Sequence, residues 1–73
     1  MRVLTEEGAK ELSHFDLLIE IEVACTGEGH HNCMLSFCRP SRERYHRQRL
    51  KVHQNNRRIA VLEVTERLEK ENN

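Results

Sequence analysis

Residues 25–46 read CTGEGHHNCMLSFCRPSRERYH, and we expect the fold to depend on this stretch. It holds all three cysteines of the 73-residue chain and three of its five histidines. Zinc in small domains is bound tetrahedrally by cysteine thiolates and histidine nitrogens, and short spacings allow two ligands to come from one turn of backbone. The density of such residues therefore predicts a structural zinc site, a metal knuckle that spans residues 25–46.

Four ligands are expected for Zn²⁺, and the favoured set is Cys25, Cys33, Cys38 and His46. His31 and His30 are the alternatives for the fourth position. In the competing interpretation the three thiols are reduced and simply packed. A composition rich in histidine also admits nickel or copper.

The spacing Cys25-x7-Cys33-x4-Cys38 resembles the first three ligands of CCCH zinc fingers, a family that mostly binds RNA. The resemblance covers residues 25–38. That family has its histidine ligand after three more residues, and this chain has Arg42 at that position. The resemblance implies a zinc knuckle that presents a surface to RNA.

The size of the chain explains why a metal would be useful. A single hydrophobic core rarely supplies more than about 3–5 kcal/mol in a domain this small. Only 37% of the residues are hydrophobic, and there is no tryptophan. An odd number of cysteines without a secretory signal predicts a reducing, intracellular compartment. No run of residues is long and apolar enough for a membrane span.

The formal net charge of zero hides a strong asymmetry along the chain. Residues 1–38 contain seven acids and two bases, whereas residues 39–58 contain eight bases and only one acid, Glu43. Guanidinium groups bind phosphate with two hydrogen bonds, so a preference for arginine favours nucleic acid as the partner. The residues expected to contact the phosphate backbone of DNA or RNA are Arg39, Arg42, Arg44, Arg47, Arg49, Lys51, Arg57 and Arg58.

Patterning predicts a small α+β fold. Thr5 can cap an N-terminal helix over residues 5–13. Apolar and polar residues alternate over residues 15–25, which favours a strand, although Ser13 could instead cap a helix there. A hairpin over residues 49–64 with a turn at Asn55-Asn56 would pair with that strand, and a C-terminal helix would follow over residues 64–71.

The alternative is an all-α fold in which residues 41–54 and 57–71 form two helices. That arrangement would place a helix-turn-helix in the C-terminal half of the chain.

These observations predict one domain, residues 1–73, in which the metal knuckle supports a basic segment, residues 39–58. We expect a regulatory or accessory protein that binds nucleic acid. Catalysis is not expected, because Glu28 is the only acid within residues 25–38 and the chain is too short to build a substrate pocket. The alternative function is a protein–protein interaction module, with a homodimer formed between the acidic and basic segments of two copies.

Overall fold

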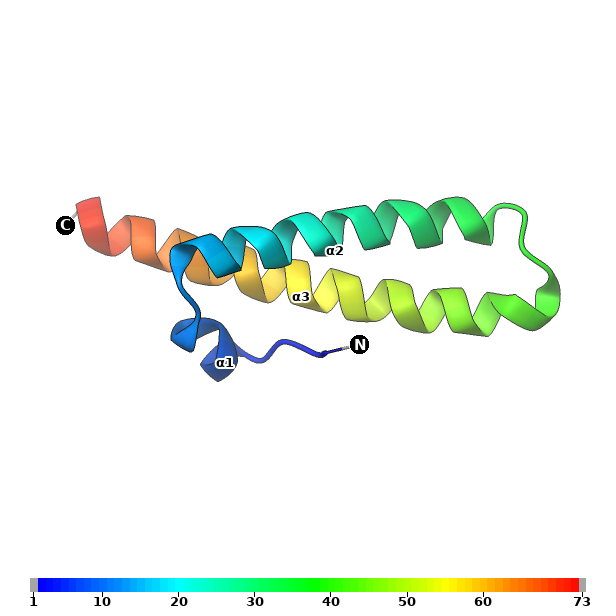
Figure 1. The fold of residues 1–73 in the computed structure, drawn as a ribbon, viewed down its shortest axis with the longest axis horizontal. Coiled ribbons are helices and arrows are strands. Elements are labelled where there is room, and N and C mark those ends of the chain that lie inside the picture. Colours follow the sequence, from blue (N-terminus) through cyan, green and yellow to red (C-terminus); the bar gives the residue numbers. More distant parts are fainter. Residues whose placement is uncertain (1, 73) are drawn as a thin grey trace.

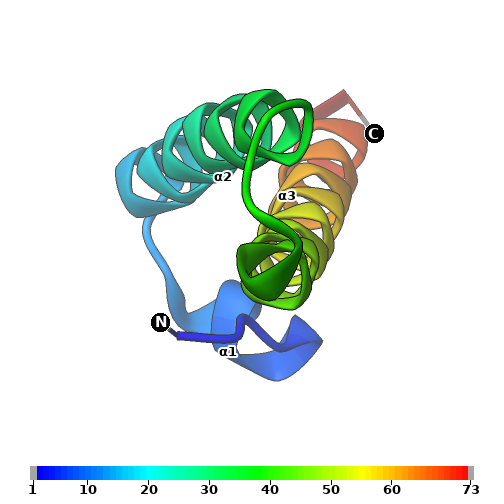
Figure 2. The ribbon, with the colours of Figure 1, turned by 90° about the vertical axis from the view of Figure 1, so that its right-hand side faces the viewer.

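The computed structural model describes residues 2–72, which form three helices: α1 (Glu6–Glu11), α2 (His14–Leu35) and α3 (Pro40–Asn72). Helices α2 and α3 lie side by side and antiparallel, and they form a hairpin in a molecule of about 50 × 18 × 15 Å (Figure 1). The short helix α1 packs against α3 on one side of the hairpin (Figure 2).

The predicted α+β class is wrong, because the described residues contain no strand and residues 15–25 lie within α2. The Ser13 hydroxyl caps this helix and accepts from the Asp16 amide at 3.1 Å. Helix α2 buries every seventh residue, Leu17, Ala24 and His31. The apolar residues that suggested a strand face are divided between solvent and the contact surface of α2 with α3, which we call the seam. Val23, for example, is 55% exposed.

The predicted hairpin over residues 49–64 is also wrong, since α3 runs through Asn55 and Asn56 without a break. The all-helical alternative is correct in its class, but the helix-turn-helix it placed here is absent from the described residues. Instead of turning the chain, Asn56 binds the N-terminal segment. Its side chain accepts from the Leu4 amide at 2.8 Å and donates to the Arg2 carbonyl at 3.0 Å.

The N-terminal helix is confirmed, with slightly narrower bounds than expected. Thr5 is its N-cap, and its hydroxyl accepts from the Gly8 amide at 3.0 Å. At the other end of α1, the Arg67 guanidinium donates to the carbonyls of Ala9, Lys10 and Leu12. The Ala9 carbonyl also accepts from the Leu12 amide at 3.2 Å, whereas the carbonyls of Lys10 and Leu12 lie at the point where the helix stops. Arg67 therefore fastens the end of α1 to α3.

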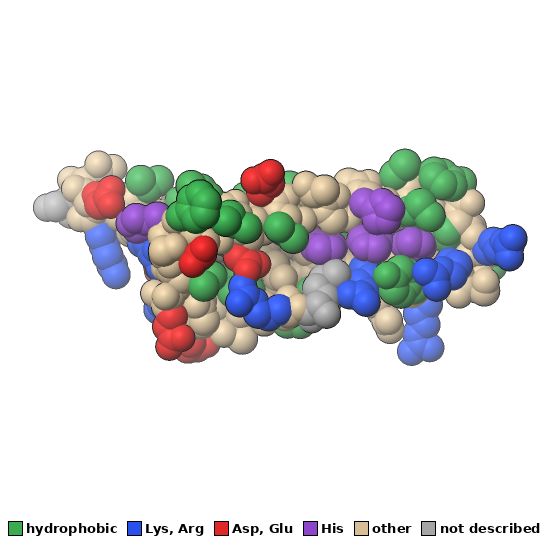
Figure 3. All heavy atoms as spheres, in the orientation of Figure 1, with side chains coloured by type: hydrophobic (Ala, Val, Ile, Leu, Met, Phe, Trp, Pro, Cys, Tyr) green, Lys and Arg blue, Asp and Glu red, His purple; other side chains and the backbone are tan. Residues whose placement is uncertain are grey.

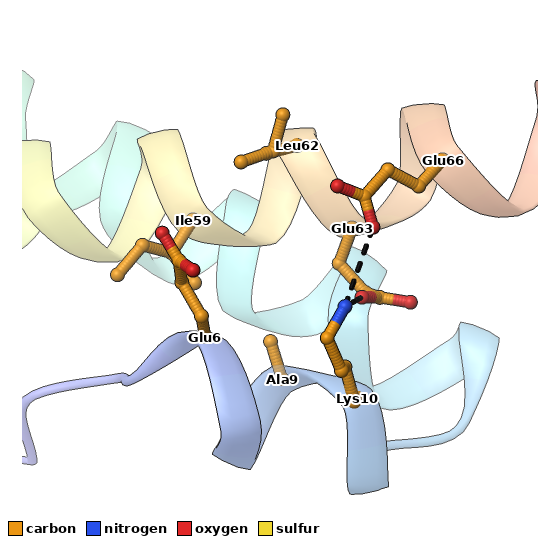
Figure 4. Close-up of a pocket in the computed structure, with 7 residues that line it drawn as sticks. All are labelled: Glu6, Ala9, Lys10, Ile59, Leu62, Glu63 and Glu66. Carbon is orange, nitrogen blue, oxygen red and sulfur yellow. Dashed lines mark hydrogen bonds and ion pairs between the residues drawn. The ribbon is translucent and has the colours of Figure 1, made fainter.

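A cluster of ion pairs completes the contact between α1 and α3. Lys10 donates to Glu63 at 3.2 Å and to Glu66 at 3.3 Å, as Figure 4 shows. Arg67 donates to Glu63 from the other side at 2.8 Å. Lys10, Glu63 and Glu66 border a hollow of about 20 Å³, which is space for about one water molecule.

The apolar core is small and lies at one end of the hairpin, where α1 covers it. Its buried members are Leu4, Ala9, Leu17, Ile59 and Ala60. Toward the loop between α2 and α3, histidines replace apolar residues in the seam, and His31, His46 and His53 are all buried. The seam of the hairpin is therefore apolar near α1 and polar near the loop.

Candidate nucleic-acid interface and histidine cluster

The antiparallel hairpin turns the charge asymmetry of the sequence into two oppositely charged halves of the molecule. We call residues 25–58, which include the loop, the loop half, and we call the remaining residues the open half. The loop half contains eight bases and two acids, whereas the open half contains four bases and ten acids. Contacts such as Glu28 with Arg57 show that these parts of α2 and α3 lie side by side. Most acidic side chains visible in Figure 3 lie on the open half.

Four of the predicted phosphate-binding residues lie along one face of α3. Steps of three, four and seven residues place them on one face of a helix, and all four are exposed. The stripe extends about 21 Å along the helix axis at 1.5 Å per residue. We call this set, Arg44, Arg47, Lys51 and Arg58, the basic stripe.

The basic stripe has few competing partners. Arg44 and Lys51 take part in no ion pair among residues 2–72. Arg47 pairs with Glu43, one turn away, at 2.8 Å. Arg58 donates to the Asn55 side chain at 3.4 Å, a weak contact.

The other predicted phosphate ligands are differently placed. Arg57 lies 2.6 Å from Glu28 of α2, and this hydrogen-bonded carboxylate raises the pKa of Arg57. The guanidinium carbons of Arg42 and Arg49 lie 4.4 Å and 5.2 Å from the centre of the Tyr45 ring. Arg39 is exposed just before α3 begins. The structure therefore assembles four of the eight predicted residues and engages three others within the protein.

The four predicted zinc ligands are not brought together. Cys25 and Cys33 are exposed on α2, Cys38 is half-buried beyond its end, and all three thiols are free. Seven residues of helix lie between the first two, which are therefore about 12 Å apart along the axis. Within residues 2–72, no group of three or more His, Cys, Asp or Glu side chains is arranged to hold a metal ion. Zinc binding by Cys25, Cys33, Cys38 and His46 stays a prediction, and it would require α2 to unwind.

The histidines, in contrast, gather in the seam of the loop half and appear as the purple group in Figure 3. The Nδ1 atoms of His31 and His46 are 2.8 Å apart, so one ring donates its proton to the other. His53 stacks on His31 with ring centres 5.6 Å apart and planes 23° apart. His30 meets His31 edge-on at 4.9 Å. We call these four residues the histidine cluster.

Gly27 is the residue that makes room for this cluster. A Cβ atom at position 27 would lie 2.2 Å from Nε2 of His53, which is far inside contact distance. Glycine within a helix costs about 1 kcal/mol relative to alanine. The packing of an imidazole against the bare backbone of α2 accounts for a glycine at this position of a 22-residue helix.

The histidine cluster lies among positive charges. Burial, together with the neighbouring imidazoles of His30, His46 and His53 and the cation of Arg49, lowers the pKa of His31. Burial, followed by Arg42 and His30, lowers the pKa of His46. Both rings are therefore neutral at physiological pH, the form in which imidazole hydrogen-bonds as donor and acceptor and also binds metals.

The sequence interpretation missed the partnership of His31, His46 and His53. A signal for it was present in the repeat of seven residues, since Leu17, Ala24 and His31 share one helix face and His46, His53 and Ala60 share another. Aligning these two repeats in opposite directions places the histidines together. The repeat is hard to recognise because its leucine, alanine and histidine members differ in size and polarity.

Among residues 2–72, no helix has both the length and the apolar character needed to cross a membrane. No family model, curated protein or solved structure matches this chain.

Proposed function

We propose that this protein binds nucleic acid through its phosphate backbone and acts as an accessory or regulatory factor rather than a catalyst. The observation that carries the proposal is the basic stripe, which follows the exposed face of an uninterrupted helix. The only acid between positions 39 and 58, Glu43, is engaged with Arg47.

Two further features support a polyanionic partner. The open half concentrates ten of the twelve acids, so the loop half presents a basic surface with little internal compensation. Arginine is well suited to phosphate because its planar fork makes two parallel hydrogen bonds. The three free thiols fit a reducing, intracellular compartment, where nucleic acid is available.

Binding should be measured by fluorescence anisotropy with labelled duplex and single-stranded oligonucleotides of mixed sequence over a range of salt. We expect the logarithm of the affinity to fall linearly with the logarithm of salt, by about 0.9 for each phosphate neutralised on a duplex. The triple variant Arg44→Ala, Arg47→Ala, Lys51→Ala should reduce the slope by about 2–3 and weaken binding to all sequences similarly.

A matched pair of lysines on α3 provides the control. Lys51 lies in the basic stripe, whereas Lys70 lies at the far end of the same helix in the open half. Replacing either one by alanine removes one charge from an exposed helical position, but only Lys51→Ala should weaken binding. Equal losses of affinity in the two variants would mean that binding depends only on net charge, which would contradict the proposal. Absence of binding at low salt would also contradict it.

A specific observation favours a second candidate function, self-association. Leu18 of α2 and Leu68 of α3 are 56% and 54% exposed, and with Val64 they line a hollow of about 300 Å³. Both helices of the hairpin contribute to this apolar hollow, as they do where two hairpins pack into a four-helix bundle. His14, Arg67 and Glu71 also line this hollow. A second copy related by a twofold axis would cover this apolar hollow with the same hollow of its own.

A further inference from the structure

We propose that Tyr45, together with Arg42 and Arg49, binds an unpaired base by stacking, so that the protein prefers single-stranded nucleic acid to duplex. This preference rests on the proposed function and adds to it the form of nucleic acid that the protein selects. The three side chains belong to α3, on the face next to the basic stripe.

The Tyr45 ring is held in place at the edge of the seam. It meets the ring of His46 edge-on with centres 5.1 Å apart, and it meets the ring of His31 edge-on at 6.0 Å. Both histidines are buried, whereas Tyr45 is 38% exposed. The seam therefore supports an aromatic ring that is partly open to solvent. A ring held in this way loses little conformational freedom when a base stacks on it.

Two arginines converge on this ring from opposite directions along the helix. The guanidinium carbon of Arg42, three residues before Tyr45, lies 4.4 Å from the ring centre, and that of Arg49, four residues after it, lies 5.2 Å away. Among residues 2–72, neither guanidinium takes part in an ion pair. Both charges are therefore free to attract phosphate, which arginine binds with two parallel hydrogen bonds.

An unpaired base can take the place of the Arg42 guanidinium on the Tyr45 ring. A cation–π contact at an exposed site is weak, and stacking of a base on an aromatic side chain is stronger. Arg42 is exposed, so its long side chain can move from the ring to the phosphate of the same nucleotide. This exchange replaces a weak contact with a stack and a charge-assisted hydrogen bond.

The preference for a single strand follows from which bases expose a face. In a duplex each base is stacked between its neighbours, so it reaches Tyr45 only by leaving the stack, which costs free energy. The basic stripe contacts phosphates and accepts either form. Because Tyr45 directly follows Arg44 in α3, the stacking site and the basic stripe lie on adjoining faces of the helix, about 100° apart.

Tyr45 provides a direct readout, because it is the only tyrosine and the chain has no tryptophan. Tyrosine emission of the full-length protein is titrated with a single-stranded oligonucleotide of mixed sequence. A second titration uses an abasic strand of the same length, which keeps the phosphates and lacks the bases. After correction for light absorbed by the strand, we expect only the base-bearing strand to quench the emission.

Fluorescence anisotropy with labelled strands then gives the affinities. The base-bearing strand should bind about tenfold more tightly than the abasic strand, since stacking on an aromatic side chain contributes about this much. Equal affinities, or emission that the bases do not quench, would overturn the proposal.

Two variants of Tyr45 separate stacking from structural support. Tyr45→Leu keeps an apolar side chain against the histidines and removes the aromatic face, so it should lower the affinity for the base-bearing strand about tenfold, to that for the abasic strand. Its affinity for duplex and for the abasic strand should not change. Tyr45→Phe keeps the ring and should bind like the parent.

Phe37→Leu is the matched control, because it removes another exposed aromatic ring from the loop half. A loss of affinity in Phe37→Leu that is absent from Tyr45→Leu would place the stacked base elsewhere and overturn the proposal. Equal losses for duplex and single strand in Tyr45→Leu would show that Tyr45 only supports the fold, which would also overturn it.

Failure of base stacking and failure of the proposed function give different results. Salt-dependent binding of duplex and abasic strands, with no gain from the bases, would overturn base stacking alone. Absence of binding to every strand at low salt would overturn both. If circular dichroism shows that Tyr45→Leu does not fold, the comparison of base-bearing and abasic strands with the parent protein decides.

Discussion

At the scale of single residues, Glu63 and Arg67 decide how α1 stays attached to the hairpin. The Glu63 carboxylate accepts from Arg67 of its own helix and from Lys10 of α1, with a second carboxylate, Glu66, on the far side of Lys10. The hydrogen bond from Arg67 is the main cause that lowers the pKa of Glu63, and burial opposes it. The folded protein therefore favours the ionised form of Glu63 over the protonated form.

The pH dependence of stability follows from that direction. A carboxyl group whose pKa is lower in the folded state stabilises the fold above its unfolded pKa, near 4.5, and loses this contribution as the pH falls through the folded value. The free energy of unfolding should therefore decrease as the pH falls below about 4.5. Glu63→Gln should be less stable at pH 7 and should show a shallower decrease.

Urea unfolding followed by circular dichroism at several pH values measures both effects. Glu69→Gln is the control, because Glu69 is exposed on the same helix and belongs to no ion pair among residues 2–72. If Glu63→Gln kept the full acid sensitivity of the parent, the decrease would have to come from other carboxylates.

At the scale of elements, α3 serves as the platform on which the N-terminal segment is mounted. Asn56 satisfies both the Leu4 amide and the Arg2 carbonyl, and Asn55 donates to the Leu4 carbonyl at 3.2 Å. Two side chains of a helix thus bind an extended backbone much as a neighbouring strand would.

Replacing Asn56 by alanine should free this segment without melting the hairpin. The variant leaves the buried Leu4 amide without a partner, which costs about 1–3 kcal/mol. Faster hydrogen exchange at the amides of residues 4–12, with unchanged protection in α2 and the rest of α3, would be the expected result. Gln54→Ala, at an exposed position of the same helix, should change neither. Unfolding of the hairpin in the Asn56→Ala variant would contradict this separation.

Asn55 and Asn56 also show why local sequence patterns predicted the wrong secondary structure. Asn-Asn favours turns, and alternation of Ile, Glu and Val favours a strand, but both are local preferences. Here Ser13 caps one long helix and the antiparallel partner fixes the seam, so tertiary context overrides both. The N-terminal cap at Thr5 could be predicted because its signal is complete within four residues.

The candidate site was predictable to a similar extent. Clustered charge identified the basic segment, and one face of it became the basic stripe. The separation of Arg42 and Arg49 from that stripe depends on Tyr45 and the seam, which only the packed hairpin defines. The spacing of the cysteines suggested a knuckle because it was read as a loop, whereas a continuous α2 holds Cys25 and Cys33 apart.

At the scale of the whole molecule, the division into a basic loop half and an acidic open half bears on how copies would meet. The apolar hollow lies on the open half, between the start of α2 and the end of α3. A twofold dimer formed there would bring two acid-rich halves together and leave both basic stripes at its far ends. Pairing of a basic half with an acidic half would instead produce a head-to-tail contact.

Salt distinguishes these two modes of association, because it screens exposed charges. Dimerisation through the apolar hollow should strengthen when sodium chloride is raised from about 0.05 M to about 0.5 M, since screening reduces repulsion between the acid-rich halves and leaves apolar burial in place. Head-to-tail pairing should weaken over the same range. Sedimentation equilibrium measures the association constant directly.

Variants at the apolar hollow complete this test. Leu18→Asn and Leu68→Asn should each cost about 1.5 kcal/mol or more, which is about tenfold in the dimer dissociation constant. Phe37→Asn is the matched control, because Phe37 is 69% exposed but lies in the loop half. A protein that stays monomeric at every salt concentration, or a dimer that only Phe37→Asn disrupts, would contradict association through this hollow. A dimer that salt strengthens and Leu68→Asn breaks would carry two basic stripes at opposite ends, and under the proposed function it would bind two segments of nucleic acid at once.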